Sequence, residues 1–319
     1  MTPTADPATP DADDRSVSRP ARVLRNRPDS PAILADLLGP TGLFEDGPPV
    51  AVLDVGANPL DEQAPYQVLL DADLCTVTGF EPQPDALAVL LERAGPHERY
   101  LPWVIGDGGD HTLRLCASPG FAGLLEPDPD QLRVLVDFPD LARVTAREQV
   151  TTRRLDDLPD LGRVDLVKID IQGGELSALT GGRRVLSDAV AVQTEVGFHR
   201  LYEDQPTFAD VDLELRRQGF VPHSFVATRT WPLSPVPWAD RLERAARHLV
   251  EADLLYVRDL ARLDLLSDGQ LVRLALISDL VYGSAGVALR CIGELVGRGA
   301  LDPEAESGYR ALATARLKP

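Results

Sequence analysis

The run Val50–Val55 is apolar except for Asp54 and passes directly into Gly56-Ala57-Asn58. Similar short apolar runs recur along the chain, separated by stretches with apolar residues at helical spacing. This alternation is typical of parallel strands joined by crossover helices, and it predicts an α/β fold with a doubly wound, Rossmann-like sheet. Seven runs are predicted strands: Val50–Val55, Thr76–Phe80, Tyr100–Ile105, Leu166–Ile171, Ala191–Val196, Phe220–Phe225 and Leu254–Val257.

Helices are predicted where apolar residues follow a spacing of three and four. Pro84–Ala94, Gly174–Leu186 and Thr207–Gln218 have this pattern and are expected to cover the two faces of the sheet. The alternation of predicted strands and helices is interrupted at 107–157, where Thr112–Cys116 and Gln149–Arg154 are expected to pair as a β-hairpin. An insertion of this size after a core strand is often a lid.

The ends of the chain differ from the middle. Residues 1–30 are rich in Pro, Asp, Ala, Thr and Arg without apolar periodicity, which predicts a disordered tail. We expect the main domain at 31–260 and a helical C-terminal extension at 261–319. Predicted helices near this extension are Ala239–Leu249, which follows the Pro-rich and aromatic Trp231–Trp238, and Gly269–Arg298.

Charge and composition narrow the partners. The net charge of −18 argues against a nucleic acid, because such binding depends on Lys and Arg that neutralise phosphates. No run approaches the roughly 20 apolar residues of a membrane helix, and nothing resembles a signal peptide, so we expect a cytoplasmic protein without a membrane partner. Apolar spacing in Leu271–Leu280 and Val287–Val296 fits core packing or a homo-oligomer, and core packing is the default.

The first two strands carry the signal of a nucleoside cofactor. Gly56 allows a sharp turn and close approach of a ligand, and Asp54 is expected to hydrogen-bond in this loop or to a cofactor amine unless it only caps the next helix. Glu81, followed by Pro82 and Gln83, ends the next strand, where a carboxylate can accept both ribose hydroxyls.

The loop after the first strand separates the candidate cofactors. A dinucleotide needs a Gly-rich turn for its pyrophosphate, whereas the chain reads Gly56-Ala57-Asn58-Pro59-Leu60-Asp61. Asp61 and Glu62 would repel a pyrophosphate but tolerate a sulfonium. The sequence therefore favours S-adenosyl-L-methionine over NAD, and Asp107 is either an acceptor for the adenine amino group or part of a plain turn.

Further polar residues follow the later strands. Lys168 and Asp170 lie in an otherwise apolar strand, Glu195 lies near the end of the next strand, and His199 follows that strand. Asp170, Glu195 and His199 are the candidates, in this order, for accepting a proton from an attacking hydroxyl, with an ordinary loop histidine as the alternative for His199. A metal-assisted reaction through Asp170, Glu195 and Asp204 is conceivable, but the spacing is not diagnostic, and we predict no metal.

Taken together, these motifs resemble the FkbM-type methyltransferases from Val52 to Phe220. The resemblance rests on six segments in order: residues 54–59 (DVGANP), 79–83 (GFEPQ), 124–127 (LLEP), 152–157 (TRRLDD), 168–175 (KIDIQGGE) and 194–196 (TEV). It implies a seven-stranded methyltransferase sheet, S-adenosyl-L-methionine as donor, and O-methylation of a sugar or natural-product hydroxyl on a small-molecule acceptor.

The resemblance also implies roles for single residues. Asp54, Gly56 and Asn58 would form the cofactor loop, Glu81 would bind the ribose, Asp107 would lie on the adenine side, and Asp170 would lie near the donor methyl. The chain departs from the family at Pro59-Leu60-Asp61, where many members have a further glycine, and at 120–123 (GFAG), where relatives often have serines. The rivals are a non-catalytic binding or scaffold protein and an NAD-dependent oxidoreductase.

Overall fold

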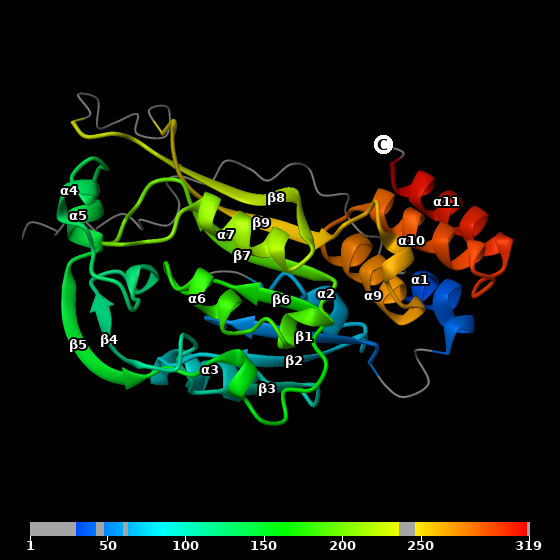
Figure 1. Ribbon diagram of the computed structural model, residues 1–319, viewed down its shortest axis with the longest axis horizontal. Coiled ribbons are helices and arrows are strands. Elements are labelled where there is room, and N and C mark those ends of the chain that lie inside the picture. The colour runs from blue at the N-terminus through cyan, green and yellow to red at the C-terminus, as the bar shows by residue number, and fades with distance from the viewer. Residues whose placement is uncertain (1–29, 43–47, 60–62, 236–245, 318–319) are drawn as a thin grey trace, which may run out of the picture.

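The computed structural model describes residues 30–42, 48–59, 63–235 and 246–317. Its centre is a seven-stranded sheet in the order β3-β2-β1-β6-β7-β9-β8, in which all neighbours are parallel except β7–β9 and β8–β9. The expected α/β, Rossmann-like sheet of seven strands is thus confirmed (Figure 1). The strands are β1 (Val50–Val55), β2 (Cys75–Phe80), β3 (Glu98–Leu101), β6 (Leu166–Ile169), β7 (Ala191–Gly197), β8 (Phe220–Trp231) and β9 (His248–Arg258).

Helices cover both faces of this sheet. The α-helices are α1 (Ser30–Leu38), α2 (Gln67–Leu70), α3 (Pro84–Arg93), α4 (Pro129–Leu132), α5 (Phe138–Leu141), α6 (Glu175–Thr180), α7 (Phe208–Arg217), α9 (Asp268–Leu276), α10 (Ala285–Gly297) and α11 (Pro303–Leu317). Short 3₁₀ turns lie at Gly39–Thr41, Pro119–Phe121, Leu155–Asp157, Val185–Ser187 and Leu263–Leu265, and η8 (Ile277–Val281) is π-helical.

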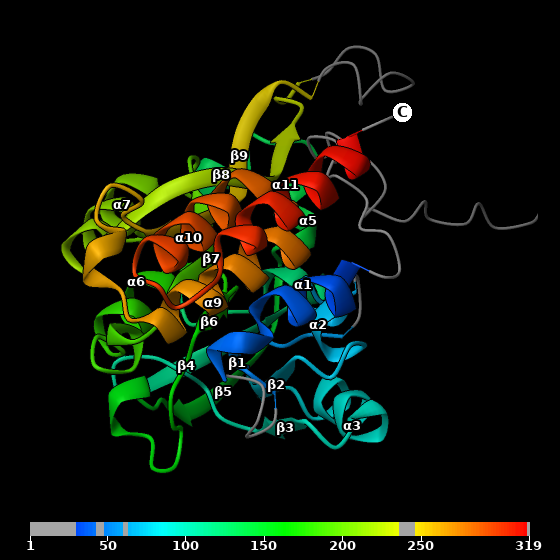
Figure 2. The same ribbon diagram turned by 90° about the vertical axis from the view of Figure 1, so that its right-hand side faces the viewer.

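The two faces have separate cores because strand side chains alternate between them. On one face, Val52, Val77 and Leu166 pack with α9 and α10, and α1, α2 and α11 join the same core. On the other, Leu53 and Val167 pack with α6 and α7. The C-terminal helices therefore supply much of one apolar layer, and Figure 2 shows them grouped with α1.

The expected insertion forms a hairpin of β4 (Asp110–Cys116) and β5 (Val144–Thr151). Thr112 pairs with Gln149, so the predicted pairing is confirmed, although the second strand begins and ends earlier than predicted. The hairpin lies, with α4 and α5, at the end of the molecule toward which β1 and β6 point (Figure 1).

Several predicted boundaries are wrong for local reasons. The strand Tyr100–Ile105 ends at Leu101, since Pro102 has no N–H for the ladder. The predicted helix Gly174–Leu186 ends at Thr180, where two glycines follow. The predicted strand Leu166–Ile171 is also shorter than predicted, because it ends at Ile169.

The greatest differences lie in the last two strands. β8 continues six residues past the predicted Phe225 to Trp231, and β9 begins at His248, well before the predicted Leu254. The predicted helix Ala239–Leu249 is wrong at His248 and Leu249, which lie in β9, and 239–245 fall outside the described residues. Gly269–Arg298 is divided into α9 and α10 by η8 and a turn.

The predicted disordered tail, 1–30, lies outside the described residues except for Ser30, which begins α1.

The first long helix of the C-terminal region, α9, begins at a capping box, in which the Gln270 N–H donates to the Ser267 hydroxyl and the Ser267 N–H donates to the Gln270 side chain. In the described part of the chain, none of the helices has the length and hydropathy to span a bilayer.

Candidate active site

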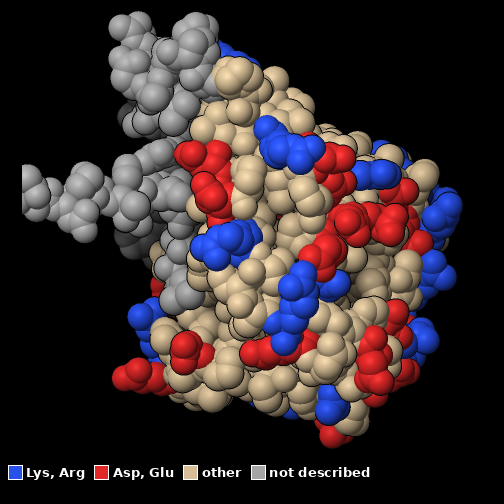
Figure 3. Space-filling model, turned by 90° about the vertical axis from the view of Figure 1, so that its left-hand side faces the viewer, with Lys and Arg blue, Asp and Glu red and all other residues tan. Residues whose placement is uncertain are grey.

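The predicted site residues lie around the carboxyl ends of β1, β2, β6 and β7, the edge where ligands bind in open α/β sheets. Figure 3 shows the end of the molecule toward which β1 and β6 point, and acidic and basic side chains intermingle across it.

Gly56 lies against the backbone of Asp170. Its φ is +83°, and a Cβ at this position would lie 2.0 Å from the carbonyl oxygen of Asp170. The sharp turn predicted for Gly56 is present, and the space that the missing side chain leaves is taken by the neighbouring loop. The loops after β1 and β6 are thereby held in direct contact.

Asp54 is buried and has two partners inside the chain. Its Oδ2 accepts a hydrogen bond of 2.6 Å from the Tyr66 hydroxyl, and its Oδ1 lies 3.2 Å from Lys168 Nζ. Lys168 Nζ also lies 3.4 Å from the carbonyl oxygen of Gly56. The nearby carboxylates of Asp54 and Asp170 outweigh burial and raise the pKa of Lys168, so Lys168 stays charged under this loop.

Glu81 ends β2 as a buried carboxylate, with 2% of its surface exposed. Its Oε1 accepts a 2.8 Å hydrogen bond from the Gln83 backbone N–H, which shapes the turn through Pro82 into α3. Burial raises the pKa of Glu81, while the Gln83 hydrogen bond and Lys168 act against the rise. Glu81 is thus a fixed acceptor group at the position predicted for a ribose.

Asn58 is exposed just beyond Gly56, whereas Asp61 and Glu62 lie outside the described residues. Asp107, which lies in the bend between β3 and β4, is exposed and organises its own turn. Its Oδ1 lies 2.8 Å from both the Gly109 N–H and His111 Nε2, and these bonds lower the pKa of Asp107 to about 2. This geometry is that of the plain turn which was one of the two interpretations of Asp107.

Asp170 and Glu195 meet through one amide. The Gln172 Nε2 group donates to Asp170 Oδ1 at 3.1 Å and to Glu195 Oε2 at 3.2 Å. The Tyr202 hydroxyl lies 3.1 Å from Gln172 Oε1 and orients this amide. The structure thus joins two of the three predicted proton acceptors in one network.

The Glu175 carboxylate is hydrogen-bonded to the backbone of the loop after β6. Its Oε1 accepts hydrogen bonds from the backbone N–H groups of Ile171 and Gly173, at 3.0 and 3.2 Å. Gln172 and Gly173 both have positive φ, at 53° and 92°. Burial, with Asp170 nearby, raises the pKa of Glu175 to about 7 against the effect of its hydrogen bonds.

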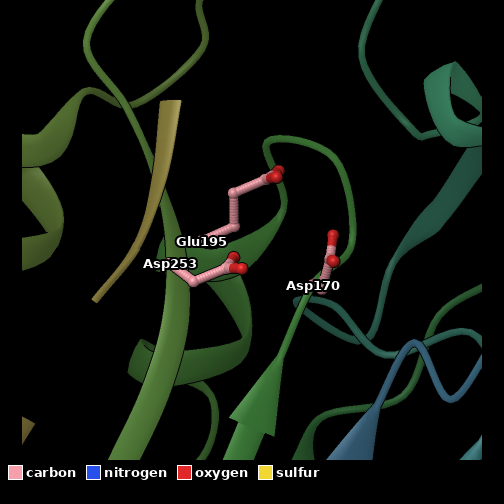
Figure 4. Close-up of side chains that lie close together, drawn as sticks. All are labelled: Asp170, Glu195 and Asp253. Atoms are coloured by element: carbon pink, nitrogen blue, oxygen red, sulfur yellow. The ribbon is translucent and has the colours of Figure 1, made fainter. Parts of the chain in front are cut away.

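Three residues that were not predicted as site residues lie beside Asp170 and Glu195. Two of them, Asp253 and Glu251, form a carboxylate group with Asp170 and Glu195, and the third is Arg229. Asp253 on β9 lies opposite Glu195 in the β7–β9 ladder, and carboxylate oxygens of Asp170, Glu195 and Asp253 lie within 4.8 Å of one another (Figure 4). Glu251, also on β9, projects to the same side as Asp253, because it lies two residues away. Arg229 on β8 contacts three members of this group.

His199 lies apart from this group. Its Nε2 donates to the carbonyl oxygen of Gln131 at 3.2 Å, and its Nδ1 is 3.1 Å from His248 Nε2. Both ring nitrogens therefore have partners, one on α4 and one on β9. These partners differ from the Gln172 amide that joins Asp170 and Glu195.

Oxygen ligands at this spacing are the kind that Mg²⁺ prefers. Asp204, which the sequence analysis considered for a metal, is exposed and is not part of the group; Asp253 takes that place. Arg229 already brings a positive charge to Glu195, Glu251 and Asp253, so the carboxylates have a cation from within the chain, and we do not assign them as metal ligands.

Comparison with known proteins identifies a family to which this chain is similar. Residues 54–222 match the family described as "Methyltransferase FkbM domain", a segment that contains every predicted site residue from Asp54 to His199. A 2-O-methyltransferase, NoeI of Sinorhizobium fredii (strain NBRC 101917 / NGR234), is 30% identical over 186 residues, which cover 54% of this chain and 73% of that protein.

Solved structures with a similar fold are more distant. The magnesium protoporphyrin IX methyltransferase ChlM from Synechocystis PCC 6803, with bound SAM, is 13% identical and has a TM-score of 0.35, covering 72% of this chain and 79% of that one. A methyltransferase from Thermoplasma acidophilum, described as putative, is 12% identical with a TM-score of 0.32 and covers 66% of this chain and 69% of the other.

Proposed function

Because this chain belongs to the FkbM methyltransferase family, we propose that it transfers the methyl group of S-adenosyl-L-methionine to a hydroxyl of a sugar or natural-product small molecule. The observation that carries the proposal is the contact between the loops after β1 and β6. Gly56 lies against the backbone of Asp170, so a donor bound over the first loop would lie next to Asp170, which follows β6, and Glu195, near the end of β7.

The residues present fit this cofactor. Glu81 offers a buried, preoriented carboxylate to a ribose, and the excess of carboxylates around Asp170 suits a donor that carries a sulfonium and an amino group. When bound, S-adenosyl-L-methionine supplies an electrophilic methyl group. The remaining work falls to the protein, which orients the acceptor, excludes water and takes up the hydroxyl proton.

Asp170 and Glu195 are the groups placed for that proton. Both are hydrogen-bonded to Gln172, and Glu195 is 7% exposed, so it is held away from bulk water. Burial and the neighbouring Glu251 and Asp170 raise the pKa of Glu195 well above its usual value. In its ionised form, a carboxylate with a raised pKa is a stronger base than an ordinary one, but only the ionised fraction can accept the proton.

The name of the 2-O-methyltransferase relative supports an oxygen acceptor over a nitrogen acceptor. The excess of acidic residues, 50 against 32 basic ones, agrees with an acceptor other than a nucleic acid. The proposed acceptor is accordingly a small hydroxylated molecule, either a sugar or a natural product.

Calorimetry tests the donor. S-adenosyl-L-methionine, S-adenosyl-L-homocysteine and NAD would be titrated into the wild type, Glu81→Ala and the control Glu92→Ala, which changes an exposed residue of α3. We expect both sulfur nucleosides to bind, Glu81→Ala to weaken them at least about tenfold, and Glu92→Ala to have no effect. Binding of NAD without a response to S-adenosyl-L-homocysteine would contradict the proposal and favour the oxidoreductase.

Transfer of a labelled methyl group to a panel of sugar glycosides and natural-product alcohols then tests the reaction. Label in an alkali-stable ether product is the expected result. Tight binding of S-adenosyl-L-homocysteine with no label in any acceptor of the panel would favour the non-catalytic alternative. Label in an amine product instead would correct the proposal to N-methylation.

A further inference from the structure

Arg229 reaches the carboxylate group from the edge of the sheet. It lies opposite Glu251 in the β8–β9 ladder, and the register of this ladder shifts between Arg229 and Thr230. Its Nη1 is 3.3 Å from Glu195 Oε1 and 3.5 Å from Asp253 Oδ1, and its Nε is 3.6 Å from Glu251 Oε1. One guanidinium therefore bridges carboxylates on two strands.

This arrangement arises from strands beyond the family segment. Arg229, Glu251 and Asp253 all follow residue 222, where the match to the family ends. β9 runs antiparallel between β7 and β8, so its acidic side chains lie between Glu195 on one side and Arg229 on the other. The C-terminal strand pair thus contributes charges to the site that the family segment does not contain.

We propose that Arg229 is a positioning residue, which holds Glu195 in place and increases the fraction of its carboxyl group that is ionised at neutral pH, so that it can accept the proton of the attacking hydroxyl. This inference rests on the proposed function. In the reaction, the acceptor oxygen bonds to the methyl carbon as the methyl–sulfur bond breaks, and the hydroxyl proton passes to Glu195. The sulfonium becomes a neutral thioether, and Glu195 becomes a neutral acid that later releases its proton to solvent.

The surrounding charges explain why Glu195 needs this partner. Burial raises the pKa of Glu195, and the carboxylates around it act in the same direction, whereas Arg229 lowers it. Without Arg229, Glu195 would therefore be protonated over more of the neutral range. The charged or titratable groups that face Glu195 or Arg229 are Asp170 after β6, Glu175 on α6, Glu251 and Asp253 on β9, with Lys168 on β6 and Tyr202 after β7 next to them.

The mutual fit of the cluster supports the same role. Opposite charges on Asp253, Glu195 and Glu251 raise the pKa of Arg229 in spite of its burial, so the guanidinium stays charged throughout. Its planar fork can contact several carboxylates at once, which an ammonium group does less well in a fixed geometry. The charge of Arg229, more than its shape, is what the ionisation of Glu195 requires.

Carboxyl ¹³C NMR of the whole protein tests the proposal without an acceptor. The Glu195 signal, assigned by its loss in Glu195→Gln, would be titrated in the wild type, Arg229→Met and Arg229→Lys. We expect Arg229→Met to move the Glu195 titration upward by at least about one pH unit, and Arg229→Lys to move it by less than half as much. Arg216→Met, which removes an exposed arginine of α7, is the control and is expected to leave it in place.

The second readout is the pH dependence of kcat, measured as transfer of a labelled methyl group to an acceptor. Since Glu195 must be ionised, the rise of kcat with pH is expected to shift upward in Arg229→Met, with most of the loss recovered at high pH, and to return toward the wild type in Arg229→Lys. If Arg229→Met does not fold, Arg229→Gln, which keeps hydrogen bonds without the charge, replaces it. An unchanged Glu195 titration in the folded, uncharged variant overturns the proposal. Failure of the wild type to methylate any acceptor overturns the proposed function instead, and the titration of Glu195 still decides the effect of Arg229.

Discussion

Asp54 on β1 and Lys168 on β6 face each other across the ladder of the two central strands, with Lys168 Nζ 3.2 Å from Asp54 Oδ1. The side chains of Asp54 and Lys168 are 4% and 18% exposed. This ion pair lies directly below the loop that begins at Gly56, whose carbonyl oxygen is 3.4 Å from the same Nζ. The same pair of residues therefore joins the two central strands and contacts the loop that follows β1.

Removing one partner of this pair is expected to be costly. Lys168→Met would leave the buried Asp54 carboxylate with Tyr66 as its remaining partner, and we expect a loss of about 3 kcal/mol in the free energy of unfolding. The double variant Asp54→Asn/Lys168→Met should lose less than the sum of the two single changes, since it leaves no unpaired charge. Urea unfolding measures both.

The exposed pair Arg262–Asp264 provides the matched control, because its side chains are 56% and 61% exposed. Arg262→Ala is expected to change the free energy of unfolding by less than about 0.5 kcal/mol. If Lys168→Met lowers the free energy of unfolding as little as Arg262→Ala does, the ion pair between Asp54 and Lys168 does not stabilise the fold.

Glu175 gives a prediction about pH and stability. Its pKa is raised from the usual 4.5 to about 7 by burial, so between these two values the folded protein binds more protons than the unfolded chain. The free energy of unfolding is therefore expected to fall as the pH rises through this window. Glu175→Gln, whose amide oxygen can still accept the Ile171 and Gly173 N–H groups, should remove this dependence and exceed the wild type in stability above pH 7 by roughly 2 kcal/mol.

Glu214 is the control of opposite sign. Its hydrogen bonds to Arg183 lower its pKa, so its contribution to stability is present above the usual carboxyl range and is lost as the pH falls. Glu214→Gln should therefore be less stable than the wild type at pH 7 and approach it in acid. Parallel pH profiles of unfolding for Glu175→Gln and the wild type would contradict the assignment for Glu175.

The sequence was sufficient for the fold class and for the first half of the site. Each of the four central strands ends in a recognisable polar or glycine signal, and the carboxyl edge of a parallel sheet brings such ends together whatever the exact strand lengths. Glu81, Asp170 and Glu195 could be located in this way. The contact of Gly56 with the Asp170 backbone could not, because it depends on how two loops far apart in the sequence approach each other.

The second half of the site was missed because β8 and β9 were predicted too short. A helix was expected up to Leu249, and the strand was expected to begin at Leu254, just after Asp253. A signal was available: Val250, Ala252 and Leu254 alternate with Glu251 and Asp253, a period of two that indicates a strand with one polar face. The position of Arg229 carried no such signal, since it depends on the register of β8 against β9.

The roles of Asp170 and His199, beside the proposed proton acceptor Glu195, can be separated by substitution. Asp170→Asn is expected to lower kcat for methyl transfer at least about 100-fold, since Asp170 lies in the carboxylate group next to the Gly56 loop. His199→Asn is expected to lower it less than about fivefold, because both nitrogens of His199 are occupied by Gln131 and His248. Calorimetry with S-adenosyl-L-homocysteine checks that each variant still binds. A larger loss for His199→Asn than for Asp170→Asn would assign the chemistry to the histidine.

Removal of metal ions tests whether the guanidinium of Arg229 takes the place of a metal ion beside these carboxylates. Asp170, Glu195 and Asp253 have the spacing of a divalent cation site, but Arg229 brings its charge to two of them. We therefore expect wild-type protein dialysed against EDTA to keep its rate of methyl transfer within about twofold, and added Mg²⁺ to have no effect. Arg229→Gln, which lacks this charge, would be assayed in parallel under the same conditions. Loss of wild-type activity in EDTA that Mg²⁺ or Mn²⁺ restores would show that the carboxylates act as metal ligands and that Arg229 does not replace the ion.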